Sequence, residues 1–165
     1  MNVLGKLINS RTWWLSIAIA CVLLEGVALY YQYALDYLPC VLCIHVRMLL
    51  AALLLISVIA VIINSRVVRI SCQLLSIGTL LVLVERSWKL LAVERGWLIG
   101  DCEMTSGLPE WLALESWFPA IFKIHEPCGY TPYILFEISM AELLLAGSII
   151  ASLFMFLILI AKKVK

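Results

Sequence analysis

The stretch PCVLCIHVR (residues 39–47) opens a run of apolar residues that continues to about Ile63. This run is long enough to cross a bilayer as a helix, which takes about 20 residues. Proline is favoured at the first position of a helix, because its missing N–H needs no partner there. We therefore expect Cys40 and Cys43 in the first turn, where the positive end of the helix dipole favours thiolate over thiol.

Arg47 follows Cys43 by four residues, so the two side chains share one face of the predicted helix, with about 5–6 Å between their Cβ atoms. A guanidinium there would stabilise negative charge on the Cys43 sulfur or on a group bound beside it. Arginine near a helix end also commonly extends to the membrane surface, which is the alternative for Arg47. The two cysteines could instead be inert or form half of a metal site, but no second CxxC completes a common zinc pattern. We expect no metal.

The composition places this pattern in a membrane protein. Of the 165 residues, 64% are hydrophobic and 14% are charged, and the mean hydropathy is +1.07. Soluble domains carry about 25% charged residues. A net charge of +1 argues against nucleic acid as a partner.

The hydropathy predicts an all-α fold, an integral membrane four-helix bundle that forms a single domain over residues 1–165. We expect helices at about 12–32, 40–63, 67–91 and 133–161, joined on one side by loops at about 33–39 and 92–132.

The positive charges predict the orientation of the bundle. Lys and Arg accumulate on the cytoplasmic side of membrane proteins. The two chain ends and the turn near residues 64–66 hold seven of the twelve: Lys6, Arg11, Arg66, Arg69, Lys162, Lys163 and Lys165. Both termini are therefore expected in the cytoplasm, and the loops at 33–39 and 92–132 outside.

This orientation divides the six cysteines. Cys40, Cys43, Cys102 and Cys128 are expected on the outer side, where disulfides form and persist. Cys21 and Cys72 are expected within the bilayer or near its inner face, as small buried hydrophobic residues.

The second outer loop is predicted to contain a short amphipathic helix in the membrane interface. Thr105 or Ser106 could cap it, and Pro109 with Glu110 suits a first turn. The apolar residues at helical spacing are Trp111, Leu114, Trp117, Phe118, Ile121 and Phe122, and Pro119 is expected to kink or end the helix. Cys102 and Cys128 flank this segment; a disulfide between them is sterically plausible, although spacing does not demonstrate it.

These motifs together resemble one known family. Cys40-Val-Leu-Cys43 with Arg47, followed by Cys102, the segments GLPEWL (107–112) and WFP (117–119), and Cys128, is similar to the DsbB family, the quinone-linked disulfide bond formation proteins of the bacterial inner membrane. The resemblance covers nearly the whole chain.

The resemblance implies a relay of disulfide exchange. Cys102 and Cys128 would react with a periplasmic DsbA-like protein of the thioredoxin fold, and Cys102 would form the mixed disulfide. Cys40 would then exchange disulfides with Cys128. Cys43 would face a bound quinone from the membrane pool, ubiquinone or menaquinone, and Arg47 would assist its binding and reduction.

Two positions depart from the family pattern. Many members have a histidine in the quinone region near the outer end of the third helix. The best match here is Arg95, which becomes a further candidate for quinone binding. His45 occupies a position where the family often has an aromatic residue, so it either packs at the interface or contacts the quinone.

Glu25 and Glu142 lie within apolar runs, and acids inside a membrane are functional candidates. Each could handle protons or form ion pairs, with Arg86, Lys89 or each other. For the whole chain, the alternatives to the relay are a specialised paralogue serving one dedicated partner, and a non-enzymatic scaffold or small transporter whose cysteines only link the outer loop.

Overall fold

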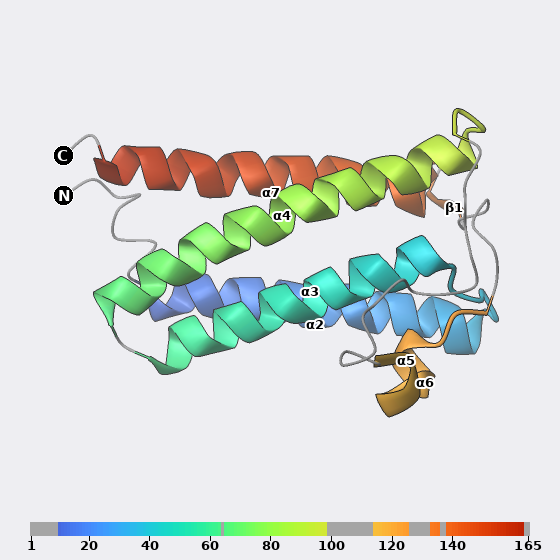
Figure 1. Cartoon of the computed structure of the whole chain (residues 1–165), viewed down its shortest axis with the longest axis horizontal. Coiled ribbons are helices and arrows are strands. Elements are labelled where there is room, and N and C mark those ends of the chain that lie inside the picture. The colour runs from blue at the N-terminus through green and yellow to red at the C-terminus, as the bar shows by residue number, and fades with distance from the viewer. Residues whose placement is uncertain (1–9, 64, 99–113, 126–132, 136–137, 164–165) are drawn as a thin grey trace.

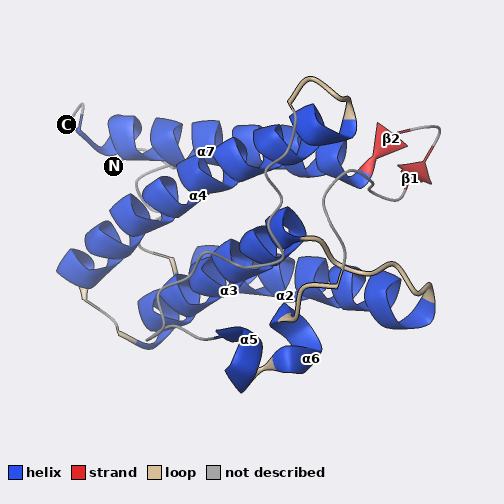
Figure 2. Cartoon of the chain, turned by 45° about the vertical axis from the view of Figure 1, so that its right-hand side comes forward, coloured by secondary structure: helices blue, strands red, loops and turns tan. Residues whose placement is uncertain are grey.

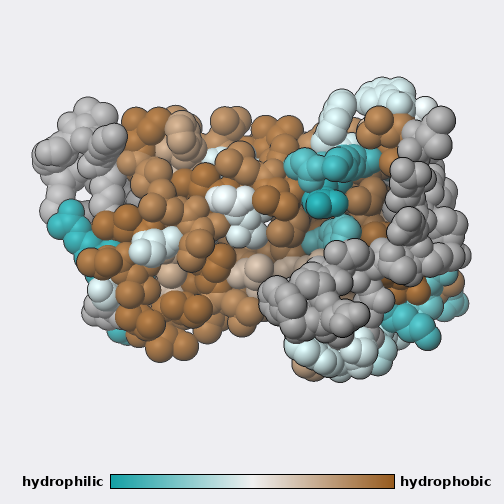
Figure 3. Space-filling model, in the orientation of Figure 1, coloured by the Kyte–Doolittle hydropathy of each residue, from teal (hydrophilic) through white to brown (hydrophobic). Residues whose placement is uncertain are grey.

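Four long antiparallel helices make up most of the chain (Figure 1). The computed structural model describes residues 10–63, 65–98, 114–125, 133–135 and 138–163. The long helices are α2 (Arg11–Ala34), α3 (Val41–Ile62), α4 (Arg66–Glu94) and α7 (Met140–Lys163). Each contains an apolar window long enough to cross a membrane, and their outward surface is mostly hydrophobic (Figure 3). The chain is a multi-pass membrane protein, and the predicted all-α four-helix bundle is confirmed.

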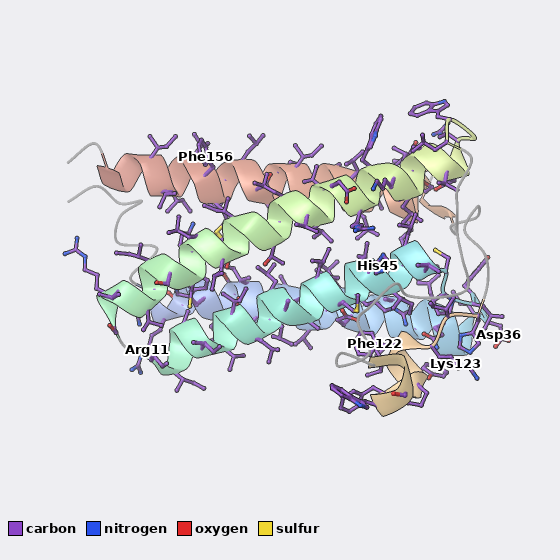
Figure 4. The ribbon with its side chains drawn as sticks, viewed as in Figure 1. Arg11, Asp36, His45, Phe122, Lys123 and Phe156 are labelled. Atoms are coloured by element: carbon purple, nitrogen blue, oxygen red, sulfur yellow. The ribbon has the colours of Figure 1, made fainter. Side chains whose placement is uncertain are left out.

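The bundle has two ends of different character. Arg11 lies at the end where α2 begins and α7 finishes, whereas Asp36 and Lys123 lie at the opposite end (Figure 4). We call this opposite end the cysteine end, because the α2–α3 connection and Cys40 are located there.

Apolar side chains from all four helices form the core in the middle of the bundle. Each helix packs against the next, in the order α2, α3, α4 and α7. The central cluster contains Cys21 from α2, Val46 and Leu50 from α3, Leu80 from α4 and Met155 from α7. Cys21 and, in a second cluster, Cys72 are buried, as expected for small hydrophobic side chains.

A buried amide joins α4 to α7. The Gln73 side chain is fully buried, and its Nε2 atom donates to the Met155 carbonyl at 3.0 Å. A polar group in the membrane interior needs such a partner, and hydrogen bonds between helices help to hold membrane bundles together.

The fourth long helix begins at Met140, later than the start expected near residue 133. Two short antiparallel strands precede it, β1 (Tyr133–Leu135) and β2 (Ile138–Ser139). A capping box then starts the helix: Ser139 Oγ accepts from the Glu142 amide at 3.3 Å, and Glu142 Oε2 accepts from the Ser139 amide at 3.2 Å. These two reciprocal bonds explain why α7 begins at this point.

The described part of the predicted interfacial helix forms two single-turn helices, α5 (Leu114–Trp117) and α6 (Pro119–Phe122), beside α2 and α3 (Figure 2), and the break before Pro119 agrees with the kink or end expected at that residue. Phe118 separates them with φ −133° and ψ 65°, because the residue before a proline avoids the helical region. Trp117 and Phe118 are exposed and Phe122 is buried. Trp111 and the predicted caps Thr105 and Ser106 lie outside the described residues.

The capping box gives a first testable prediction. Ser139→Ala should lower the free energy of unfolding by about 1 kcal/mol, because the first turn of α7 loses its side-chain acceptor. Unfolding in detergent, followed by circular dichroism, measures this loss. Ser148→Ala is a matched control: this buried hydroxyl donates to the Leu145 carbonyl of its own helix. Equal effects of the two substitutions would contradict a capping role for Ser139.

Candidate functional site

Cys40 is the N-cap of α3, and Cys43 lies in the first turn of that helix. The helix begins at Val41, so the expectation that Pro39 occupies the first helical position is wrong. The Cys40 sulfur itself accepts from the Cys43 backbone amide at 3.4 Å, which is the acceptor role of an N-cap side chain. The two Sγ atoms lie 2.8 Å apart as a hydrogen-bonded dithiol. The pair is therefore close enough to interconvert with a disulfide through a small movement.

The hydrogen bond from the Cys43 side chain lowers the pKa of the Cys40 thiol below its usual value. Burial acts in the opposite direction, and backbone N–H groups at the start of α3 add to the lowering. Cys40 is consequently the member of the pair whose thiolate is stabilised. A thiolate is the reactive form in disulfide exchange.

The pair is surrounded by apolar side chains from three helices. Cys40 is only 3% exposed and clusters with Leu90 and Leu91 from the end of α4 and with Ala141 from the start of α7. Cys43 packs against the same cluster. This environment suits a lipid-soluble reactant better than a charged one.

Arg47 is buried rather than extended to the surface. Its side chain is 5% exposed, and its guanidinium donates to three acceptors from two other segments. The hydrogen bonds run from Nη1 to Gln32 Oε1 at 2.5 Å, from Nη1 to the Ile121 carbonyl at 3.0 Å, and from Nη2 to the Ala28 carbonyl at 3.0 Å. Arg47 thus joins α3 to α2 and α6, one helical turn beyond Cys43 and in electrostatic contact with it.

Gln32 and Tyr33 are site residues that the sequence analysis did not identify. Gln32 is 7% exposed and Tyr33 donates from its hydroxyl to the Ala120 carbonyl at 2.5 Å. The aromatic sequence around them (residues 30–33) is typical of an interfacial anchor. The sequence signal that could have identified Gln32 is its position as the single amide side chain among tyrosines, because a polar side chain that becomes buried near a helix end needs a hydrogen-bond partner.

The segment that follows α6 contacts the residue just before Cys40. The His125 amide donates to the Pro39 carbonyl at 3.2 Å. The predicted residues Cys102 and Cys128 themselves lie outside the described residues.

Arg95 and Glu142 form an ion pair between the end of α4 and the start of α7. Glu142 therefore pairs with a cation, although with neither Arg86 nor Lys89. Those two residues instead interact with Glu85 on α4. The role of Arg95 in quinone binding stays a prediction.

His45 is two residues from both Cys43 and Arg47, about 200° around the helix from each. It interacts electrostatically with Glu85 of α4, so α3 presents it on a different side from the Cys43 and Arg47 face. Glu25 interacts electrostatically with Arg47. Within the described part of the chain, both of its carboxylate oxygens are buried without a hydrogen-bond partner.

Comparisons with known proteins agree with this geometry. The family model described as DsbB, disulfide bond formation protein DsbB, matches residues 10–159. Disulfide bond formation protein B 2 of Pseudomonas aeruginosa is 31% identical over 98% of this chain and 95% of the relative. Disulfide bond formation protein B of Shewanella loihica is 30% identical over 86% of this chain and 84% of the relative. Disulfide bond formation protein B of Haemophilus influenzae is 28% identical over 100% of this chain and 94% of the relative.

The stabilised Cys40 thiolate gives a second prediction. In fully reduced protein, alkylation of Cys40 should persist to lower pH than for an ordinary thiol, and Cys43→Ala should move the profile to higher pH. The reason is that alanine removes the donor that lowers the Cys40 pKa. Mass spectrometry of the Cys40 peptide after timed iodoacetamide treatment measures the profile. Cys43→Ser, which keeps a donor, should stay nearer to wild type. An unchanged profile in Cys43→Ala would contradict the assignment.

Proposed function

Because this chain belongs to the DsbB family of disulfide bond formation proteins, we propose that it is a membrane thiol:quinone oxidoreductase of the bacterial inner membrane. It takes electrons from a periplasmic DsbA-like dithiol protein and passes them through Cys102 and Cys128, then Cys40 and Cys43, to a bound quinone. The observation that carries this proposal is the dithiol at the start of α3, with a buried arginine one turn away.

Electrons and protons balance along this route. A dithiol partner that reduces a Cys102–Cys128 disulfide is left with a disulfide of its own. The reduced outer pair then exchanges with a Cys40–Cys43 disulfide, so the outer disulfide forms again and Cys40 and Cys43 become thiols. Their reoxidation releases two electrons and two protons, which a bound quinone accepts as it becomes hydroquinone.

The residues at the site fit a quinone. The described hydrogen bonds of Arg47 use three of the five N–H donors of a guanidinium. Among the described residues the other donors have no acceptor, so they would be able to bind a quinone carbonyl oxygen and to stabilise the negative charge that develops during its reduction. Cys43 would face the same group, with the apolar cluster around Cys40 beside it. Arg95, at the end of α4, is the weaker candidate.

The contact between His125 and Pro39 supports the exchange between the two pairs. Cys128 follows His125 by only three residues in the sequence. Since His125 is bonded to the residue before Cys40, the described part of the outer loop reaches the Cys40 end of α3 three residues before Cys128 in the sequence, which supports an exchange between Cys128 and Cys40.

Quinone reduction tests the whole proposal. Purified protein supplied with a reduced thioredoxin-fold dithiol and ubiquinone-1 or a menaquinone analogue should turn over, and Cys43→Ser or Cys102→Ser should abolish turnover. Absorbance of the quinone follows the reaction. Cys21→Ser is the control, because Cys21 packs in the core away from the pair and should keep wild-type activity. A folded wild type that reduces none of these quinones would favour a scaffold.

Arg47→Ala separates the two halves of the relay. It should lower the rate of quinone reduction by about 100-fold, because the developing charge loses its cation. Formation of the mixed disulfide at Cys102 should continue, as measured by acid quenching and mass spectrometry. Arg47→Lys keeps the charge but loses the planar guanidinium, so its rate of quinone reduction should lie between those of the wild type and Arg47→Ala. Loss of both steps together would assign Arg47 a purely structural role.

A further inference from the structure

The segment from α6 to His125 is held against the bundle by hydrogen bonds from several elements. Tyr33 Oη and Gln32 Nε2 donate to the Ala120 carbonyl at 2.5 and 3.3 Å. Arg47 Nη1 donates to the Ile121 carbonyl at 3.0 Å. With the His125 bond to Pro39 described above, the segment is tied to α2, to α3 and to the connection between them. We call residues 119–125 the docked segment.

Gln32 occupies a special place in this network because both ends of its amide are used. Its Oε1 accepts from Arg47 at 2.5 Å while its Nε2 donates to Ala120. The side chain is 7% exposed, so water has little access to replace either bond. The amide therefore forms a bridge between the docked segment and the guanidinium beside Cys43.

We propose that Gln32 is a positioning residue that couples docking of residues 119–125 to the orientation of Arg47 for quinone binding. This inference rests on the proposed function. In the docked arrangement, Gln32 and Ile121 hold Nη1 from two sides and leave the remaining guanidinium donors for the quinone. When the segment leaves, Arg47 loses the Ile121 carbonyl and Gln32 loses its acceptor, so the guanidinium is no longer held in one orientation.

The coupling would link disulfide exchange in the outer loop to quinone reduction at Cys43. Cys128 follows the docked segment in the sequence, whereas Arg47 lies one turn from Cys43, so one network connects the segment that precedes Cys128 with the arginine proposed for quinone binding. Exchange between Cys128 and Cys40 and transfer from Cys43 would then be favoured in the same conformation. Departure of the segment towards a partner would weaken quinone binding at the same time.

Thermodynamic linkage makes this coupling measurable without turnover. If docking favours quinone binding, then quinone binding must favour docking by the same factor. The readout is hydrogen–deuterium exchange of residues 118–125, in which the amides of Ile121, Phe122 and Lys123 bond to the Phe118 and Pro119 carbonyls and the His125 amide bonds to Pro39. Saturating decylubiquinone should raise the protection of this peptide by about fivefold in the wild type, at the lower end of usual coupling.

Two variants test the role of Gln32. Gln32→Leu, which removes both bonds of the amide, should abolish the protection caused by decylubiquinone. Tyr33→Phe removes a hydrogen bond to the docked segment, and the Tyr33 side chain also interacts electrostatically with Arg47, so its effect on decylubiquinone binding should be clearly larger in the wild type than in the Gln32→Leu background. A merely structural Gln32 would not produce this dependence. Tyr30→Phe loses the same hydroxyl group from an exposed position on α2 and should behave like wild type.

The outcomes separate this inference from the proposed function. Failure of the wild type to bind either decylubiquinone or a menaquinone analogue, in titrations followed by protein fluorescence, would overturn both; if only the menaquinone analogue binds, it replaces decylubiquinone in these experiments. Binding without any change in the protection of residues 118–125 would overturn the coupling alone. If Tyr33→Phe weakens decylubiquinone binding equally with and without Gln32, the coupling is also overturned, because the Gln32 amide would then not be needed for it. If Gln32→Leu does not fold, Gln32→Asn, whose shorter amide does not reach both partners, replaces it.

Discussion

A guanidinium buried among apolar helices must have its N–H groups accepted by nearby oxygen atoms, because an uncompensated charge away from water is very costly. Arg47 meets this requirement with three acceptors, the Gln32 side chain and the Ala28 carbonyl of α2 and the Ile121 carbonyl of α6. The arrangement of the cysteine end depends on this one group. It joins α2 and α6 to the helix that carries the thiols, and it places positive charge one turn from Cys43.

The same constraint shapes the rest of the bundle. In a membrane, polar groups find partners inside the protein; several serine hydroxyls here bond within their own helix, whereas other polar side chains join two elements. The Gln73 amide joins α4 to α7, and the pair between Arg95 and Glu142 joins the end of α4 to the start of α7. The apolar core supplies the bulk of the contacts, while these few polar bonds fix where helices meet and where α7 begins.

Sequence patterns identified the dithiol and its arginine because local spacing controls both. CxxC places two sulfurs on adjacent turns, and the spacing of four residues puts Arg47 on the face of Cys43. The exact helix start was less accessible. Proline at residue 39 suggested a first helical position, but the Cys40 sulfur takes the N-cap role. The start of α7 was also placed too early, because the hydropathy of residues 133–139 does not reveal the capping box that starts this helix.

The sequence by itself determined the membrane class, the four long helices and the candidate redox residues, because hydrophobic length and residue spacing are local properties. Only the tertiary structure showed which acceptors surround Arg47, that Arg95 pairs with Glu142, and that Gln32 and Tyr33 hold Ala120. Gln32 and Ala120 are far apart in the chain, and no periodicity relates them. Their contact exists because a buried cation and an amide must share the few oxygen atoms that the fold brings within reach.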